Sequence, residues 1–297
     1  MKKCLLLSKV IDENNNWIAE PSTVVIQIGD QLDGIRPMGY DKANNPNGIY
    51  DISIMLYLNE LHRKAQEKDK NSGVYGIIGN HEMMNVDDPF NTTIYMDPKD
   101  IEVFNSKNEL MNKLNYEPNE DFNTNRINCF RPGHSCAVFL ACTRHSIMKI
   151  GSNLFVHAGL VKDFAERYNI HQVNEYVKGW LLGKIDKEIK YDIIRGSTDL
   201  TFASSPLWTR LYDIDDIDGF KFEDNKTICQ KFDNIRRMYE FDNMIIGHSV
   251  QVKGINSVCD KKIWKIDVGL SKCFEGIPNK KIQILEIIND NEFHILE

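Results

Sequence analysis

Four segments of the sequence place a polar side chain at the end of an apolar run, beside a glycine. The segments read VVIQIGDQLD, VYGIIGNHE, NLFVHAGL and MIIGHSV, and the polar residues that follow their apolar runs are Asp30, Asn80, His157 and His248. Short apolar runs of this kind predict buried strands, whose ends commonly carry functional residues. A single histidine in such a place is more often a hydrogen-bonded core residue. Four such placements in one chain favour a common site.

Carboxylate, amide and imidazole ligands predict a divalent cation such as Mn, Fe or Zn at this site. A structural zinc site would instead require closely spaced thiolates. The seven cysteines show irregular spacing and no CxxC pair, so we interpret them as reduced and mostly buried thiols. The ligand types therefore favour catalysis over scaffolding.

The elements around these residues predict an α/β fold. The segment TVVIQIGD is predicted to be a strand, Ile49 to about Lys68 a helix, and VYGIIGN the next strand. This order predicts a βαβ crossover and a largely parallel sheet, with its site at the carboxyl ends of the strands. Later strands, in DNMIIGHS, KIWKIDVG and KKIQILEIINDNEFHILE, predict a more antiparallel sheet in the second half.

Two segments do not follow this alternation of strands and helices, and both are predicted to cover the site. Residues 86–130 are rich in Asn, Asp and Pro and contain one short predicted helix, near Lys107 to Leu114. Residues 161–200 are helical by pattern over their first part, with Val173, Val177 and Trp180 on one face. We expect one domain, residues 1–297, with both segments as insertions.

Bulk composition limits the partners. The 297 residues carry a formal net charge of −7 and are 42% hydrophobic, which is typical of a globular protein and gives no general attraction for nucleic acid. No apolar run is long enough to cross a bilayer, and the amino end lacks the pattern of a secretory leader. The expectation is a soluble, cytoplasmic protein without membrane or nucleic-acid partners.

The motifs GDxxD, GNHE, HAG and GHS, in this order, resemble those of the calcineurin-like metallophosphoesterases, specifically the phosphoprotein phosphatases. The stretches FRPGHSCAVFLA and SSPLWTRLY resemble the Shewanella-like branch of that family, so the resemblance extends from about Lys3 to about Gly269. It implies an α/β/β/α sandwich of two mixed sheets flanked by helices. It also implies hydrolysis by a hydroxide held between two metal ions.

The resemblance assigns roles to particular residues. Asp30 would bridge both ions, and the remaining ligands of the second ion are Asn80, His157 and His248. His81 corresponds to the histidine that protonates the leaving oxygen, and Asp33 would orient it. Arg210, in PLWTR, corresponds to an arginine that binds phosphate. The family pattern GDxxDRG is replaced here by GDQLDGIR, so the corresponding role of Arg36 is a weaker hypothesis.

One motif of the family is not found in the sequence. A strand that ends in D-x-H-G supplies two ligands of the first ion in the family, and nothing before Asp30 resembles it. The resemblance then predicts one tightly held ion at most and a strongly reduced turnover. It suggests that Met1 is an internal methionine of a longer protein or the start of a truncated product.

Three functions are compatible with these motifs. The leading hypothesis is a metal-dependent phosphatase that acts on phosphoprotein side chains, Ser/Thr or Tyr. The first alternative is a phosphoesterase for nucleotides or small phosphate esters, because covering insertions set the substrate on a shared metal core. The second alternative is an inactive, phosphatase-like protein that binds phosphorylated partners, as the absent motif would suggest.

Overall fold

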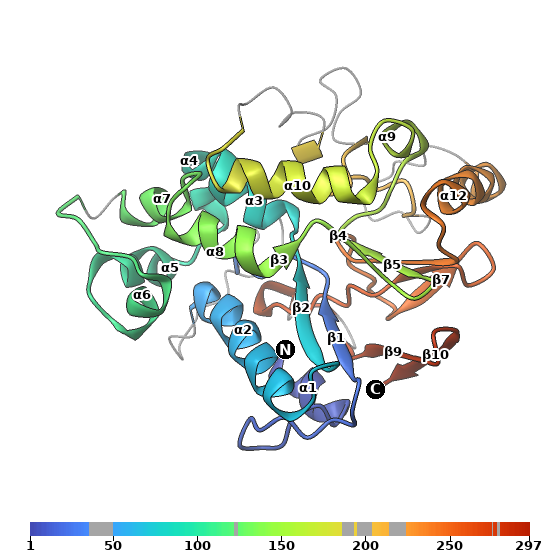
Figure 1. Cartoon of the computed structure of the whole chain (residues 1–297), viewed down its shortest axis with the longest axis horizontal. Helices are drawn as coiled ribbons and strands as arrows, with labels where there is room; N and C mark the ends of the chain where they lie inside the picture. Colours follow the sequence, from blue (N-terminus) through green and yellow to red (C-terminus); the bar gives the residue numbers. More distant parts are fainter. Residues whose placement is uncertain are drawn as a thin grey trace.

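The computed structural model of the chain describes residues 1–35, 50–121, 124–185, 193–194, 204–213, 224–274, 276–277 and 280–297 (Figure 1). Arg36, a predicted phosphate ligand, lies outside the described residues, as does much of the predicted insertion 161–200 beyond residue 185.

The first sheet is a parallel, three-stranded sheet that contains the predicted βαβ crossover. Its strands are β1 (Val24–Gln27), β2 (Gly73–Ile77) and β3 (Arg144–His145), in the order β1-β2-β3. Val24 pairs with Gly73 and Gly76 with Arg144, and both ladders are parallel. The crossover helix α2 (Asp51–Lys68) runs alongside β2 (Figure 1) and ends close to the predicted position.

The second sheet is mixed and has the order β4-β5-β6-β8-β7. Its central strands β5 (Asn153–Val156), β6 (Asn243–Ile246) and β8 (Ile263–Lys265) are parallel. The strands β4 (Ile147–Ile150) and β7 (Asn256–Val258) pair antiparallel at its two edges. The strands β9 (Ile284–Ile288) and β10 (Glu292–Leu296) form the antiparallel pair predicted at the carboxyl end.

Apolar cores on both faces of the second sheet define the layers. Phe155, Ile245 and Trp264 face a core shared with Ile28 and Ile77 of the first sheet. Their neighbours in β5, β6 and β8 point to the opposite face, because successive side chains of a strand alternate. There they join a core with α8 (Ser135–Thr143), α10 (Ile170–Leu181) and α12 (Asn225–Tyr239).

The helix α2 and the short α1 (Lys2–Leu7) cover the outer face of the first sheet through a third core, which includes Leu5, Leu61 and Val74. Helices thus lie outside both sheets, which confirms the predicted α/β class and its layering. The resemblance implied two mixed sheets; the described part of the first sheet is parallel throughout, as the strand and helix order predicted, and the second sheet is mixed.

The segment 86–130 contains more helix than the single one predicted. Besides α6 (Glu109–Leu114) it holds the end of α3 (Asn80–Asp87), then α4 (Pro89–Thr92), α5 (Pro98–Glu102) and α7 (Asn125–Phe130), with 3₁₀ turns at Thr93–Tyr95 and Val103–Asn105. Each is too short to show helical periodicity in the sequence. Proline in the first turn of α4 and α5, and an asparagine cap before α6, start them locally.

The helix α12 was not predicted, although its buried residues Ile228, Phe232, Ile235 and Tyr239 recur at helical spacing. In the second predicted insertion, residues 161–200, helix α9 (Lys162–Ala165) precedes α10. In the described part of the chain, no helix is both long and apolar enough to cross a membrane.

The prediction of reduced cysteines is wrong for four of the seven. Cys129 and Cys136 form a disulfide between α7 and α8, and Cys229 and Cys259 form one between α12 and the turn after β7. Irregular spacing conceals these pairs because the fold, not the sequence interval, brings the thiols together. Disulfides are typical of oxidising compartments, so the cysteines give no support to a cytoplasmic location.

Candidate active site

The four strand-end residues meet at one point although they come from distant parts of the chain. One ligand atom each from Asp30, His157 and His248 lie within 4.8 Å of one another. The side-chain oxygen of Asn80 lies 2.9 Å from Nε2 of His157 and 3.0 Å from Nδ1 of His248. Asp30 and Asn80 follow strands of the parallel sheet, whereas the two histidines follow strands of the mixed sheet. The site therefore lies where the carboxyl ends of both sheets come together.

The orientation of His157 makes this cluster suitable for a cation. Its Nδ1 lies 2.6 Å from the carbonyl oxygen of Ile28. Because a carbonyl oxygen only accepts, Nδ1 donates to it, and Nε2 is the ring atom that faces the cluster. Nε2 lies 2.9 Å from the side-chain oxygen of Asn80 and 3.4 Å from a carboxylate oxygen of Asp30. A backbone carbonyl that fixes a histidine in this way is typical of metal-binding histidines.

His248 completes the ligand set. Burial above all, with the positive charge of Arg210 acting in the same direction, holds the pKa of His248 well below its usual value, so its ring is neutral, as a ligand must be. Its buried Nε2 has no hydrogen-bond partner among the described residues. A carboxylate, an amide oxygen and two imidazoles that converge on one point fit a divalent cation such as Mn, Fe or Zn.

Close backbone contacts and strained torsions hold the strand ends. A Cβ on Gly29 would lie 2.7 Å from the amide nitrogen of Gly79, and one on Gly79 would overlap a carboxylate oxygen of Asp30. Only glycine therefore lets the ends of β1 and β2 approach. Asp30 and His248 have positive φ angles, 55° and 66°. Such torsions are costly for residues other than glycine and are concentrated at functional sites.

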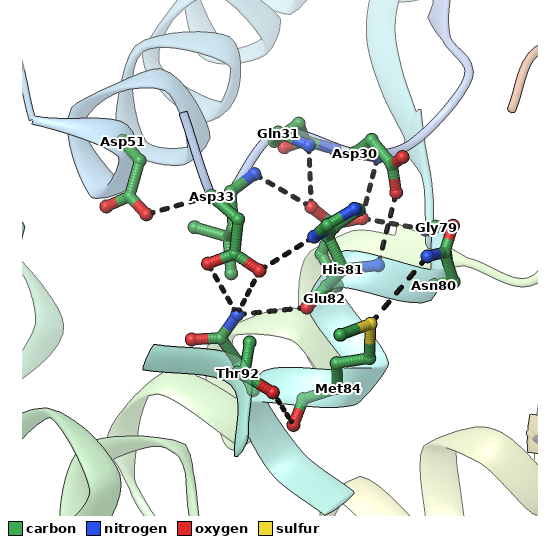
Figure 2. Close-up of polar contacts among 12 residues, drawn as sticks. Asp30, Gln31, Asp33, Asp51, Gly79, Asn80, His81, Glu82, Met84 and Thr92 are labelled. Carbon is green, nitrogen blue, oxygen red and sulfur yellow. Dashed lines mark hydrogen bonds and ion pairs between the residues drawn. The ribbon is translucent and has the colours of Figure 1, made fainter. Parts of the chain in front are cut away.

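Glu82 fastens the two loops that follow β1 and β2. It is fully buried, and its carboxylate accepts backbone N–H bonds from Asp30, Gln31, Leu32 and Gly79 at 2.6–3.1 Å (Figure 2). Burial, and then the neighbouring carboxylate of Asp30, raise the pKa of Glu82, while its backbone donors oppose this rise. Sequence analysis assigned no role to Glu82, although it belongs to the GNHE motif.

The predicted pair of His81 and Asp33 is formed. Nδ1 of His81 lies 2.8 Å from a carboxylate oxygen of Asp33, and both residues are buried (Figure 2). The ring edge of His81 also packs against Tyr95, with ring centres 5.2 Å apart. Asp33, whose φ is +64°, receives further hydrogen bonds from Asn85. Asn85 lies one helical turn after His81, and this spacing could have identified it.

Arg210 lies at the edge of the cluster. Its NH1 donates to the hydroxyl of Ser249, next to His248, at 3.0 Å and lies 3.8 Å from Asp213. The side chain is 46% exposed, so it is open to an anion from solvent. Its position is compatible with the predicted contact to phosphate.

The chain is similar in sequence to proteins named as phosphatases. The chain is 27% identical over 326 residues to Shewanella-like protein phosphatase 2 of Arabidopsis thaliana, covering 99% of this chain and 73% of that protein. It is 28% identical to Shewanella-like protein phosphatase 1 of Plasmodium berghei, covering 91% of this chain and 63% of that one. No family model matches the chain.

The resemblance to the Shewanella-like phosphatases is confirmed. The fold agrees: the crystal structure of the cold-active protein-tyrosine phosphatase of a psychrophilic Shewanella superposes with a TM-score of 0.63 at 17% identity, over 99% of this chain and 75% of that one. An enzyme of the phosphatase class, as the sequence predicted, is likewise supported by these relatives.

Proposed function

We propose that this chain is a metal-dependent phosphomonoesterase that removes phosphate from phosphoprotein side chains. The observation that carries the proposal is the meeting of Asp30, Asn80, His157 and His248 beside the pair of His81 and Asp33. The relatives named as protein phosphatases, and the tyrosine phosphatase with the same fold, support this reaction class.

Asp30, Asn80, His157 and His248 would hold the cation. When bound, a divalent cation there supplies a water of lowered pKa and neutralises charge on the phosphate oxygens. The cation is proposed to be Mn, Fe or Zn because the ligands combine oxygen and imidazole nitrogen. Among the described residues, the cluster of Asp30, His157 and His248 is the candidate site.

His81 is proposed to act as the general acid. Its Nδ1 is engaged by Asp33, which leaves Nε2 for the substrate. As the bond from phosphorus to the ester oxygen breaks and the water oxygen joins phosphorus, the leaving oxygen takes the proton from Nε2. The carboxylate of Asp33 stabilises the ring in the required orientation.

Arg210 is proposed to bind the phosphate oxygens. A guanidinium offers paired donors that match a phosphoryl group. Its hydrogen bond to the hydroxyl of Ser249, the residue after His248, holds the guanidinium beside the proposed cation ligands. Phosphoserine, phosphothreonine and phosphotyrosine side chains are the proposed substrates, because the relatives are named as protein phosphatases and the structural neighbour as a protein-tyrosine phosphatase.

The proposal is tested by metal content and hydrolysis together. The purified chain is stripped with a chelator, reloaded with Mn, Fe or Zn, and assayed for metal per chain and for release of phosphate from phosphopeptides and from dinucleotides. We expect metal-dependent hydrolysis of phosphopeptides. His157→Ala should abolish both metal binding and hydrolysis, whereas His62→Ala, which removes a half-buried histidine of α2 outside the cluster, should abolish neither.

Two results would contradict the proposal. Hydrolysis of dinucleotides in preference to phosphopeptides would favour the small-ester alternative. Binding of phosphopeptides without hydrolysis, at every metal tested, would favour the inactive, phosphate-binding protein.

A further inference from the structure

The helix α7 belongs to the segment 86–130, called the covering segment below. It reaches the pair of His81 and Asp33 through one buried arginine. Arg126 is only 3% exposed. Its NH1 and NH2 donate to the two carboxylate oxygens of Asp51 at 3.0 and 2.7 Å. Its Nε and NH2 both donate to the side-chain oxygen of Asn85, at 3.2 and 3.1 Å. The guanidinium therefore joins α2, α3 and α7 at one point.

These bonds fix the amide of Asn85. Because its oxygen accepts twice from Arg126, its nitrogen must face the other way. That nitrogen lies 3.0 Å from each carboxylate oxygen of Asp33 and 3.0 Å from the carbonyl oxygen of His81. A reversed amide would place its oxygen against the carboxylate of Asp33 and its NH₂ group against the guanidinium. Arg126 thus determines which group Asn85 offers to Asp33.

Arg126 also compensates the charge of Asp33. Its NH2 lies 3.7 Å from Asp33, whose side chain is fully buried. The guanidinium carbon lies 5.4 Å and 5.2 Å from the ring centres of Phe104 and Phe130, so two aromatic rings of the covering segment hold it in place. A buried carboxylate is stable only when it is paired and hydrogen-bonded, and these contacts supply both conditions.

A purely structural role would require only the bidentate pair between Arg126 and Asp51 and the hydrogen bond from NH1 to the carbonyl oxygen of Asp100, at 3.1 Å. The further bonds are directed through Asn85 to the carboxylate that holds the imidazole of His81. We propose that Asn85 and Arg126 are positioning residues for the general acid, and that the covering segment thereby sets how well the enzyme expels poor leaving groups. This inference rests on the proposed function of His81.

The consequence is a specific dependence on the leaving group. An ester with a stable leaving anion, such as p-nitrophenyl phosphate, needs little proton transfer, whereas phenyl phosphate needs it. A defect in the orientation of His81 therefore lowers turnover of phenyl phosphate more than turnover of p-nitrophenyl phosphate. A general loss of folded protein lowers both equally.

The experiment measures kcat/KM for both esters in Asn85→Ala and Arg126→Lys, with the metal-loaded chain. We expect the ratio of p-nitrophenyl phosphate to phenyl phosphate to rise about tenfold in each, the lower end of the effects seen for residues that orient a reacting group. Lysine keeps the charge but loses the planar fork. The matched control is Arg144→Lys, since Arg144 is also buried and stacks on a ring, Phe139, but bonds to Gln31 and Met55.

A double variant tests whether Asn85 acts through His81. In the background of His81→Ala, the substitution Asn85→Ala should leave the ratio unchanged, because the group that it positions is gone. An equal rise in the ratio with and without His81, or the same rise in Arg144→Lys, would overturn the inference.

A second measurement does not depend on turnover. In the folded wild type, NMR should show a low-field, slowly exchanging proton on Nδ1 of His81, assigned by its loss in Asp33→Asn. Asn85→Ala should shift or broaden it, and Arg144→Lys should not. Should the chain hydrolyse no ester with any metal, the proposed function fails, and this signal still decides the inference: an unchanged signal in Asn85→Ala overturns it.

Discussion

The two halves of the site are held in different ways. The cation side consists of strand ends from both sheets, and backbone contacts at Gly29 and Gly79 determine where its ligands lie. The proton side consists of His81 and Asp33, and two side chains determine its geometry: Asn85 of α3 and, through it, Arg126 of the covering segment 86–130. A site can thus combine ligands fixed by the central sheets with a proton donor fixed by peripheral helices, and the two sides should respond differently to substitution.

The largest expected effect is on the cation side. His157→Ala removes the ligand that Ile28 orients, and we expect bound metal to be lost and phosphatase activity to fall by about three orders of magnitude or more. Metal analysis and kcat/KM on p-nitrophenyl phosphate provide the measurements. An activated ester should not rescue this variant, in contrast to Asn85→Ala; rescue would mean that the two sides are not separable.

The two disulfides should differ in how much each contributes to stability and to the geometry of the proton side. The loop closed by Cys229 and Cys259 spans 30 residues and the loop closed by Cys129 and Cys136 spans 7. From loop length, serine at both positions should lower the free energy of unfolding by about 3–4 kcal/mol for the first pair and about 2–3 kcal/mol for the second. Chemical denaturation measures both.

Activity should show the opposite order. Cys129 lies on α7, which also carries Arg126, so loss of the short-loop disulfide should raise the leaving-group ratio. Loss of the bridge between Cys229 and Cys259 should leave that ratio unchanged despite the larger loss of stability. Equal ratios in the two variants would show that α7 does not need its disulfide to position Arg126.

Glu82 tests how far the loops of the two strands depend on one carboxylate. Glu82→Gln turns an NH₂ group toward backbone N–H donors, so we expect a loss of about 1–3 kcal/mol of stability and a 10- to 100-fold loss of metal affinity. Titration calorimetry with Mn and thermal unfolding would measure the two losses. The control Glu109→Gln, at an exposed residue paired with Lys113, should change stability by less than about 1 kcal/mol.

The sequence predicted the cation side better than the proton side for a physical reason. A strand that ends at Gly29-Asp30 or at His157 is visible as a local pattern, because apolar run, glycine and ligand are contiguous. Arg126 meets Asp51 across 75 residues, and no periodicity marks a contact of that kind. Apart from α6, the short helices of residues 86–130 were missed because each is too short to show helical periodicity, whereas α12 carried a helical pattern that could have been recognised.

The smallest expected effect concerns Asp100, the outermost acid of the proton side. It accepts a hydrogen bond from the backbone N–H of Asp51 at 2.9 Å. Burial, and then the carboxylate of Asp51, raise the pKa of Asp100 to about 7 from its ordinary 3.8. The folded chain therefore keeps a proton that the unfolded chain has released between these two values, and its stability falls as pH rises from about 4 to about 7.

Asp100→Asn removes this loss while keeping the oxygen that accepts from Asp51. Relative to the wild type, we expect the variant to gain stability as pH rises from 4 to 8, by at most about 4 kcal/mol at the upper end, which is the free-energy equivalent of the full pKa shift. Urea unfolding of the metal-free chain at several pH values measures the difference. The other titratable groups are the same in both proteins, so their contributions cancel in the comparison. Parallel stability curves would show that Asp100 is ionised at neutral pH.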